Sequence, residues 1–321
     1  MKTTVCRLLT GLGILIAVPL AAHPGDGLIV DDQTFYFVAT DPIAPTSSHH
    51  AALWRWSEES GLLLTYRSPH GSSNLHIEQG LDGLIYCAER RYLGDRPARP
   101  GDQPGDRDVY ETKLGRIGPD GKIIWLMGPE RGRSPFGRAA FLVDRDSNIV
   151  FADARNRVMI RDVQGRTKPL EVEETFDNIQ LLAWGPEGDI YVLDGWIIKV
   201  IAPDGSVRTL NLRHRSAGTK FVRGHGTDGT IIFDMIVDQE RHIFLADWGR
   251  QIVLRINSEG VVSLMHDNSG DFGPEGLAFY EGSLAVFESL RPRANRGILP
   301  RLTSLGLDGD ASLIYEYSGR G

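Results

Sequence analysis

The stretch at 243–260, IFLADWGRQIVLRINSEG, carries the pattern that decides the fold. A run of four apolar residues ends in a carboxylate, Asp247. A short polar step then leads to a second apolar run, which ends in an Asn-Ser-Glu-Gly turn. Short apolar runs bounded by turn residues are typical of buried β-strands. The stretch therefore predicts two short strands, a tight turn and a further strand beginning after Gly260.

The same pattern occurs six times along the chain. Each copy ends its apolar run in a carboxylate, and these residues are Asp41, Glu89, Asp153, Asp194, Asp247 and Glu288. Another apolar stretch precedes each run, and a turn with glycine and a further strand follow it, so each unit has four strands. Six such units at spacings of roughly 40–65 residues indicate a β-propeller with loop insertions. The predicted fold class is all-β: a six-bladed β-propeller of four-stranded antiparallel blades, closed into a ring so that few sheet edges stay open.

Three of the copies resemble a known repeat. The phrases IVFADARNRVMI (149–160), IYVLDGWIIKVIAPDG (190–205) and IFLADWGRQIVLRI (243–256) are similar to NHL repeats. The phrase EGLAF at 275–279 resembles the wider superfamily of SMP-30/gluconolactonase-like propellers. This resemblance extends over roughly the whole chain after the leader and implies the six-bladed fold. It implies little about function, because one fold serves many roles.

The first 22 residues differ in character from the rest. Lys2 and Arg7 precede a mostly apolar stretch that ends in small residues, which is typical of a secretory signal peptide. We therefore expect residues 1–22 to be a signal peptide and 23–321 to form a single exported propeller domain, periplasmic or extracellular. No other stretch is apolar enough to span a membrane. Cys87 then has no cysteine partner, and its apolar neighbours predict a core residue.

Charge distinguishes the two predicted faces of the ring. In such blades the first–second and third–fourth turns share one face, while the second–third loops and blade-to-blade links share the other. Segments on that second face carry sixteen basic and four acidic residues, although the chain has a net charge of −7; these segments are 90–107, 127–139, 211–224 and 290–301. The overall negative charge argues against nucleic-acid binding. The basic loops favour an anionic partner (a small molecule, a glycan or a protein segment), unless their charge serves only solubility.

Aligning the six units places four polar residues at the starts of first strands, where they would approach the channel mouth. They are His76, Gln180, Asp234 and Glu275, and three of them lie thirteen residues before their strand-end carboxylate. The alignment of Gln180 requires a one-residue insertion. Arg223 and Arg291 in the basic loops, with His225 in the glycine-rich stretch 223–229, complete the predicted ligand-binding set.

Gluconolactonase-like enzymes hold a divalent metal at such strand starts, and the resemblance implies that Asp234 and Glu275 match those positions. With His76 they form the predicted metal set, for calcium, zinc or manganese. Leu28 and Gln180 depart from the enzymes' ligand pattern. Three interpretations stay open: a non-catalytic binding propeller, a metal-dependent hydrolase or lyase, and a channel filled by water. The strand-end carboxylates, one in every unit, are predicted to be structural, because such groups accept hydrogen bonds from nearby backbone N–H groups.

Overall fold

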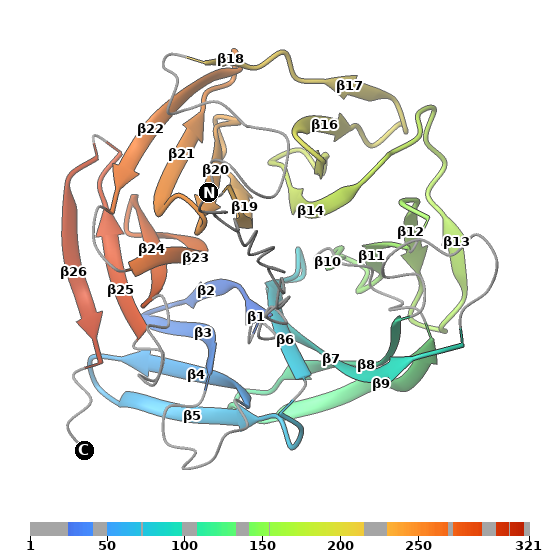
Figure 1. Cartoon of the computed structure of the whole chain (residues 1–321), viewed down its shortest axis with the longest axis horizontal. Coiled ribbons are helices and arrows are strands. Elements are labelled where there is room, and N and C mark those ends of the chain that lie inside the picture. The colour runs from blue at the N-terminus through green and yellow to red at the C-terminus, as the bar shows by residue number, and fades with distance from the viewer. Residues whose placement is uncertain are drawn as a thin grey trace, which may run out of the picture.

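The structure is a computed structural model that describes residues 25–40, 50–71, 73–97, 108–132, 141–153, 155–214, 230–268, 272–290, 300–307 and 309–317. These residues form strands and turns arranged as six sheets around a central axis (Figure 1). Every sheet contains four consecutive antiparallel strands, so the predicted six-bladed propeller is confirmed.

The first three blades follow one another along the chain. Blade 1 consists of β2 (Leu28–Asp31), β3 (Thr34–Thr40), β4 (Ala51–Ser57) and β5 (Gly61–Arg67). Blade 2 consists of β6 (Ser73–Gln79), β7 (Ile85–Asp95), β8 (Asp108–Ile117) and β9 (Ile123–Gly132). Blade 3 consists of β10 (Phe141–Val143), β11 (Ile149–Ala152), β12 (Val158–Arg161) and β13 (Thr167–Pro169).

The last three blades complete the ring. Blade 4 consists of β14 (Ile179–Trp184), β15 (Ile190–Asp194), β16 (Ile197–Ile201) and β17 (Val207–Thr209). Blade 5 consists of β19 (Ile232–Val237), β20 (Ile243–Asp247), β21 (Ile252–Ile256) and β22 (Val261–Asp267). Blade 6 consists of β23 (Phe272–Tyr280), β24 (Ser283–Leu290), β25 (Pro300–Leu305) and β26 (Ala311–Glu316). The last strand, β26, is outermost, as predicted.

Two short strands connect neighbouring blades. β1 (Gly25–Asp26) pairs in parallel with β6 before the chain continues into blade 1. β18 (Arg213–His214) pairs in parallel with β22 on the outside of blade 5, although the chain has just left blade 4. Each of these strands adds a fifth strand to a blade. β1 links blade 2 to the start of blade 1, and β18 links blade 5 to the end of blade 4.

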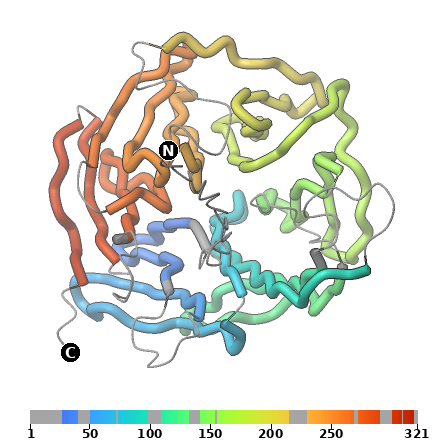
Figure 2. Tube along the Cα trace, viewed as in Figure 1, coloured from blue at the N-terminus to red at the C-terminus, as the bar shows by residue number. Residues whose placement is uncertain are grey.

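The first strands of the six blades line the central channel. β2, β6, β10, β14, β19 and β23 contact one another in that order, and β23 also contacts β2. The ring is therefore closed, with the first and last blades side by side (Figure 2). Blades 2 and 5 lie opposite each other in this ring, which matters for the predicted site.

The hydrophobic core lies between the blades rather than at the centre. Six clusters of buried side chains are present, one at each interface between neighbouring blades. Second strands such as β15 and β20 are buried along their whole length, because a neighbouring blade covers each of their faces. Cys87 belongs to the cluster between blades 1 and 2, and burial raises the pKa of its thiol, as expected of a core residue.

No helix in the described ranges is long and apolar enough to cross a bilayer.

Candidate functional site

The two ends of the ring differ in the length of their connections. At the end that we call the turn face, first and second strands are joined by two residues in blades 1 and 6 and by five in the other blades. At the opposite end, the loop face, the sequence inserts 41–49, 98–107, 133–140, 215–229 and 291–299, all outside the described residues. Function is expected mainly at the loop face and in the channel, because binding residues concentrate on loops held by rigid scaffolds.

The strand-end carboxylates act as structural clasps. Asp194 accepts hydrogen bonds from the backbone N–H groups of Asp177 and Asn178, at 2.9 and 2.6 Å, which belong to the link from blade 3. Asp247 accepts one from Ile231 at 3.1 Å, in the link before its own blade. Asp153 accepts bonds from the backbone N–H groups of Arg155 and Arg157 in its own following turn. These contacts confirm the structural role predicted for Asp153, Asp194 and Asp247, and the last two bind the link before their own blade. Asp41 lies outside the described residues.

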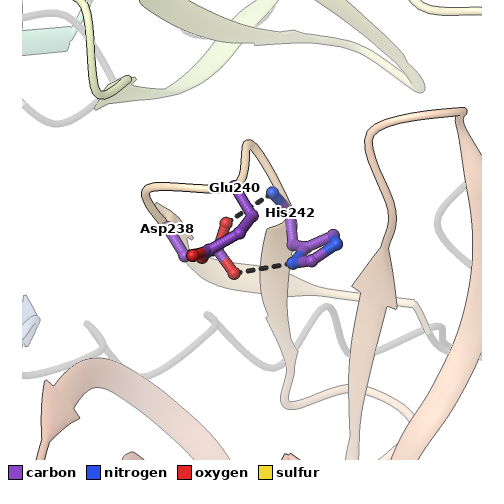
Figure 3. Close-up of side chains that lie close together, drawn as sticks. All are labelled: Asp238, Glu240 and His242. Atoms are coloured by element: carbon purple, nitrogen blue, oxygen red, sulfur yellow. Dashed lines mark hydrogen bonds and ion pairs between the residues drawn. The ribbon is translucent and has the colours of Figure 1, made fainter. Parts of the chain in front are cut away.

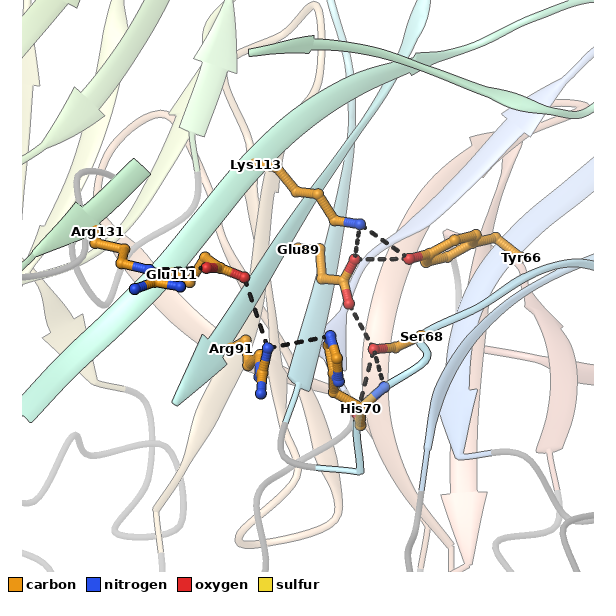
Figure 4. Close-up of polar contacts among 8 residues, drawn as sticks. All are labelled: Tyr66, Ser68, His70, Glu89, Arg91, Glu111, Lys113 and Arg131. Carbon is orange, nitrogen blue, oxygen red and sulfur yellow. Dashed lines mark hydrogen bonds and ion pairs between the residues drawn. The ribbon is translucent and has the colours of Figure 1, made fainter. Parts of the chain in front are cut away.

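Glu89 and Glu288 also bind neighbouring segments, but their hydrogen-bond donors are side chains. Glu89 is 2% exposed and accepts hydrogen bonds from Ser68 and Tyr66 of the preceding segment, at 2.5 and 2.7 Å, and from Lys113 at 2.7 Å (Figure 4). Burial alone would raise the pKa of Glu89, but these three donors outweigh it and lower the pKa below its ordinary value. Glu288, fully buried, is bound in a similar way by Asn268, Arg301 and Thr303.

The predicted channel residues do not share one register position. His76 and Asp234 are equivalent, since each pairs with the alanine that precedes its strand-end carboxylate, Ala88 and Ala246. Glu275 and Gln180 are instead the extra residues of β-bulges in β23 and β14. The bulge residue of blade 5 is Phe233. Counting thirteen residues back from the carboxylate cannot distinguish a bulge from a longer turn, so the predicted alignment was partly wrong.

The structure does not assemble His76, Asp234 and Glu275 into one metal site. In the described part of the chain, the group of His, Asp and Glu side chains whose donor atoms all lie within 4.8 Å of one another is Asp238, Glu240 and His242, described below. His76 belongs to blade 2 and Asp234 to blade 5, on opposite sides of the ring. The His76 ring packs edge-on against Phe141, 5.5 Å between ring centroids. The described structure therefore gives no support to a metal shared by these three residues, which stays a prediction.

Glu275 and Asp234 are each held by their own surroundings. The Glu275 side chain is 1% exposed and accepts a hydrogen bond from the hydroxyl of Ser289 in the neighbouring strand. Asp234 accepts a bond from the backbone N–H of Met235 at 2.8 Å and another from Leu277 of blade 6 at 2.7 Å. Asp234 thus fastens two adjacent inner strands to each other, a structural role that its sequence position does not reveal.

Replacing Asp234 by alanine is expected to destabilise the fold by about 1–3 kcal/mol, because two N–H groups lose their acceptor. Asp234→Asn keeps one acceptor oxygen and should cost less. Urea unfolding measures the stability of both variants. The change in melting temperature on adding calcium, zinc or manganese should be the same in the wild type and in the variants. A metal-dependent shift that only the wild type shows would restore the metal interpretation.

The remaining predicted ligand-binding residues separate into two groups. Arg223, His225 and Arg291 lie outside the described residues. Gln180 lies in the bulge of β14, where it is half-buried and does not belong to the donor group that the structure brings together.

The donor group that does converge lies on the turn face and consists of Asp238, Glu240 and His242 (Figure 3). Asp238 accepts bonds from the backbone N–H of His242 at 2.7 Å and from its Nδ1 at 2.8 Å. The corresponding turn of blade 3 has the same two contacts between Asp144 and Asn148, both 2.8 Å. These contacts therefore stabilise a turn, and the same arrangement recurs in the fold.

The Asp238 group is also poorly placed to bind a cation. The Nη2 atom of Arg255 lies 3.1 Å from Nδ1 of His242. A guanidinium beside a potential ligand opposes the binding of a positive ion. The donor types of this group suit a metal ion, but its contacts favour the structural role.

Blade 2 extends beyond the other blades on the loop face. Its strands β7, β8 and β9 have 11, 10 and 10 residues, against 4, 4 and 3 for the equivalent strands of blade 3. We call this extension, residues 90–97, 108–112 and 129–132, the blade 2 wall. The wall carries four arginines and four acidic residues. Its charges balance, and ten of the sixteen basic residues counted for the loop face lie outside the described residues.

Aromatic and acidic neighbours hold the arginines of the wall in place. The guanidinium of Arg90 lies 4.5 Å from the centre of the Tyr110 ring. Arg91 contacts His70 Nε2 at 3.2 Å and Glu111 at 3.8 Å, and Arg131 contacts Glu111 at 3.1 Å (Figure 4). The sequence analysis missed these partners, because it took residues 90–107 for a loop, whereas Arg90 and Arg91 lie in β7. Tyr110 and Glu111 belong to the paired strand β8, and His70 lies in the link before β6.

Fold and channel together define the protein as a six-bladed β-propeller with structural carboxylate clasps and an elaborated loop face. No family model matches the sequence, and no curated protein matches it. The fold is similar to virginiamycin B lyase from Staphylococcus aureus, with 12% identity, 94% of this chain and 86% of that chain covered, and a TM-score of 0.51. It is also similar to an auxiliary nutrient binding protein from Bacteroides thetaiotaomicron, with 13% identity, 88% and 70% coverage, and a TM-score of 0.54. At these identities the likenesses concern the fold alone.

Proposed function

We propose that the protein is an exported, non-catalytic binding propeller that recognises an anionic ligand at its loop face. The observation that carries the proposal is the blade 2 wall, a strand extension on which Arg90 and Arg91 are oriented by their neighbours. Arginine suits this role, because its planar guanidinium binds carboxylate and phosphate groups with paired hydrogen bonds. The basic loops at 211–224 and 290–301 would add to the attraction.

The proposed ligand is a small molecule, a glycan or a protein segment that carries negative charge. Export is part of the proposal, supported by the signal-like residues 1–22. A metal-dependent hydrolase or lyase is the weaker candidate, since His76, Asp234 and Glu275 are engaged separately. One structural neighbour is named a lyase and another a nutrient binding protein, so the shared fold does not favour either class.

Removing the two oriented arginines tests the proposal. Binding of trigalacturonate, inorganic phosphate and a glutamate-rich peptide would be measured by isothermal titration calorimetry, as probes of the three ligand classes. We expect at least one to bind the wild type, and Arg90→Ala/Arg91→Ala to weaken it at least tenfold, since charge-assisted bonds are lost. Affinity should also fall as salt concentration rises.

The control for this experiment is Arg166→Ala, which removes an exposed arginine from the turn between β12 and β13 at the other end of the blades. It changes the net charge by one unit without touching the loop face, so it should leave binding unchanged. Failure of all three probes to bind the wild type would contradict anionic recognition, and so would undiminished binding by the double variant.

A further inference from the structure

A separate cavity of about 320 Å³ lies in the half of the channel nearer the turn face. The inner strands of blades 1, 2, 4, 5 and 6 form its walls. Many of its side chains are apolar, among them Val30, Leu81, Trp184, Val237 and Phe279. Small-molecule sites are of this size or larger and are typically lined by apolar groups with a few polar ones.

The ionisable residues that line this cavity are Glu78 and Asp234, both carboxylates. Asp234 is bound to backbone N–H groups, as described above. The side chain of Glu78 is 24% exposed, and its carboxylate lies 3.8 Å from the imidazole of His76. The inner strands are also sheet edges, so their outward backbone N–H and C=O groups face the channel. The cavity thus combines apolar walls with negative charge and hydrogen-bonding groups.

The turns around this end of the channel are strongly acidic. The first–second turns, 32–33, 80–84, 144–148, 185–189, 238–242 and 281–282, contain nine Asp or Glu residues and two arginines. One of those arginines, Arg241, is already paired with Glu187 at 2.5 Å. Charge of one sign around an opening attracts ligands of the opposite sign, especially beside low-dielectric walls. The charge here complements a cation and repels an anion.

We propose that this cavity is a second binding site, and that it takes an organic cation with an apolar body, such as a primary ammonium carried on an aromatic ring. The ammonium group pairs with Glu78, and the apolar body packs against Trp184 and Phe279. Aromatic faces add a cation–π attraction when a cation lies within about 6 Å. The site lies at the end of the channel opposite the loop face and does not depend on the function proposed there.

Three small molecules with similar bodies and different charges test the proposal: phenethylammonium, phenethyl alcohol and 3-phenylpropionate. Isothermal titration calorimetry with the whole mature protein should show that phenethylammonium binds at least tenfold more tightly than the alcohol. 3-Phenylpropionate should bind most weakly. Equal affinities, a preference for the anion, or no binding of any of the three would overturn the proposal.

Two variants localise the interaction. Glu78→Gln removes the charge inside the cavity, and Leu81→Lys adds an opposing charge at a lining position that is 37% exposed. Each should weaken phenethylammonium binding about tenfold and leave phenethyl alcohol nearly unchanged, which a misfolded protein could not do. Unchanged ammonium binding in both variants would place the cation elsewhere and refute the site.

Glu59→Gln is the matched control, because it removes an exposed acid from the outer turn of blade 1 and so changes net charge equally. It should have no effect on any of the three molecules. Arg90→Ala/Arg91→Ala should also leave phenethylammonium binding intact. Failure of the site proposed here can therefore be told apart from failure of the loop-face function.

Discussion

Phe37→Ala is expected to lower the free energy of unfolding by about 3–5 kcal/mol, the usual cost of truncating a buried phenylalanine. Phe37 is fully buried at the interface between blades 1 and 6, with its ring stacked on Phe287 at 4.8 Å between centroids. This interface closes the ring, because it joins the first blade to the last. Its loss removes buried area from the contact that keeps the chain circular.

Urea unfolding at equilibrium, with a constant slope against denaturant, measures the effect of Phe37→Ala. Leu313→Ala is the matched control, since Leu313 lies in the outer strand β26 and is 61% exposed. That variant should stay within about 0.5 kcal/mol of the wild type. A loss below 1 kcal/mol for Phe37→Ala would mean that the closing interface contributes little to stability.

Glu89→Ala is the second large effect, with an expected loss of about 3 kcal/mol. The substitution leaves Lys113, Tyr66 and Ser68 without their shared acceptor, and Ser68 is fully buried. Removing one partner of a buried charged network costs more than the network itself contributes, because the remaining groups stay desolvated. Asp120→Ala, at an exposed turn of the same blade, is the control and should change stability little.

The stability that Glu89 contributes should depend on pH in a definite direction. Its pKa in the folded protein lies below the ordinary value of 4.5. A lowered carboxyl pKa stabilises the fold above the unfolded value, and this contribution is lost as the pH falls through the folded pKa. The stability difference between wild type and Glu89→Gln should therefore be largest above about pH 5 and shrink below pH 4.5.

Comparing wild type with Glu89→Gln at each pH is necessary, because other carboxyls respond differently. Burial raises the pKa of Asp247 despite its bonds from Arg250 and Ile231, so its contribution has the opposite sign. Urea unfolding at several values between pH 7 and pH 3 gives the difference directly. A difference that grows on acidification would contradict the role assigned to the Glu89 network.

The repeat pattern was sufficient to predict the fold, because each blade must bury its strands against neighbouring blades. Runs such as IFLAD at 243–247 are apolar at nearly every position, and β20, which they form, is covered on both faces. The strand-end carboxylates follow from the same regularity, since the sequence repeats them once in every unit and each one in the described residues accepts hydrogen bonds from nearby groups. Repetition makes these features local, and local features can be read from a sequence.

The predicted channel site depended on details that no single repeat contains. The extra residue of a β-bulge at Glu275 and the longer turn of blade 5 produce the same count of thirteen residues, although they place side chains at different positions. His76 and Asp234 lie on opposite sides of the channel because the six blades close into a ring, with blades 2 and 5 facing each other. The contact between Asp234 and Leu277 joins residues 43 positions apart.

The sequence by itself determined the number of blades, the strand order and the role of the clasping carboxylates, because hydrophobic periodicity and turn chemistry act within each unit. Only the tertiary structure decided which polar groups meet, because that depends on bulges, on turn lengths and on which blades face each other across the ring. It also revealed the acidic, apolar-walled cavity near the turn face, which forms only when inner strands from five blades converge on one axis.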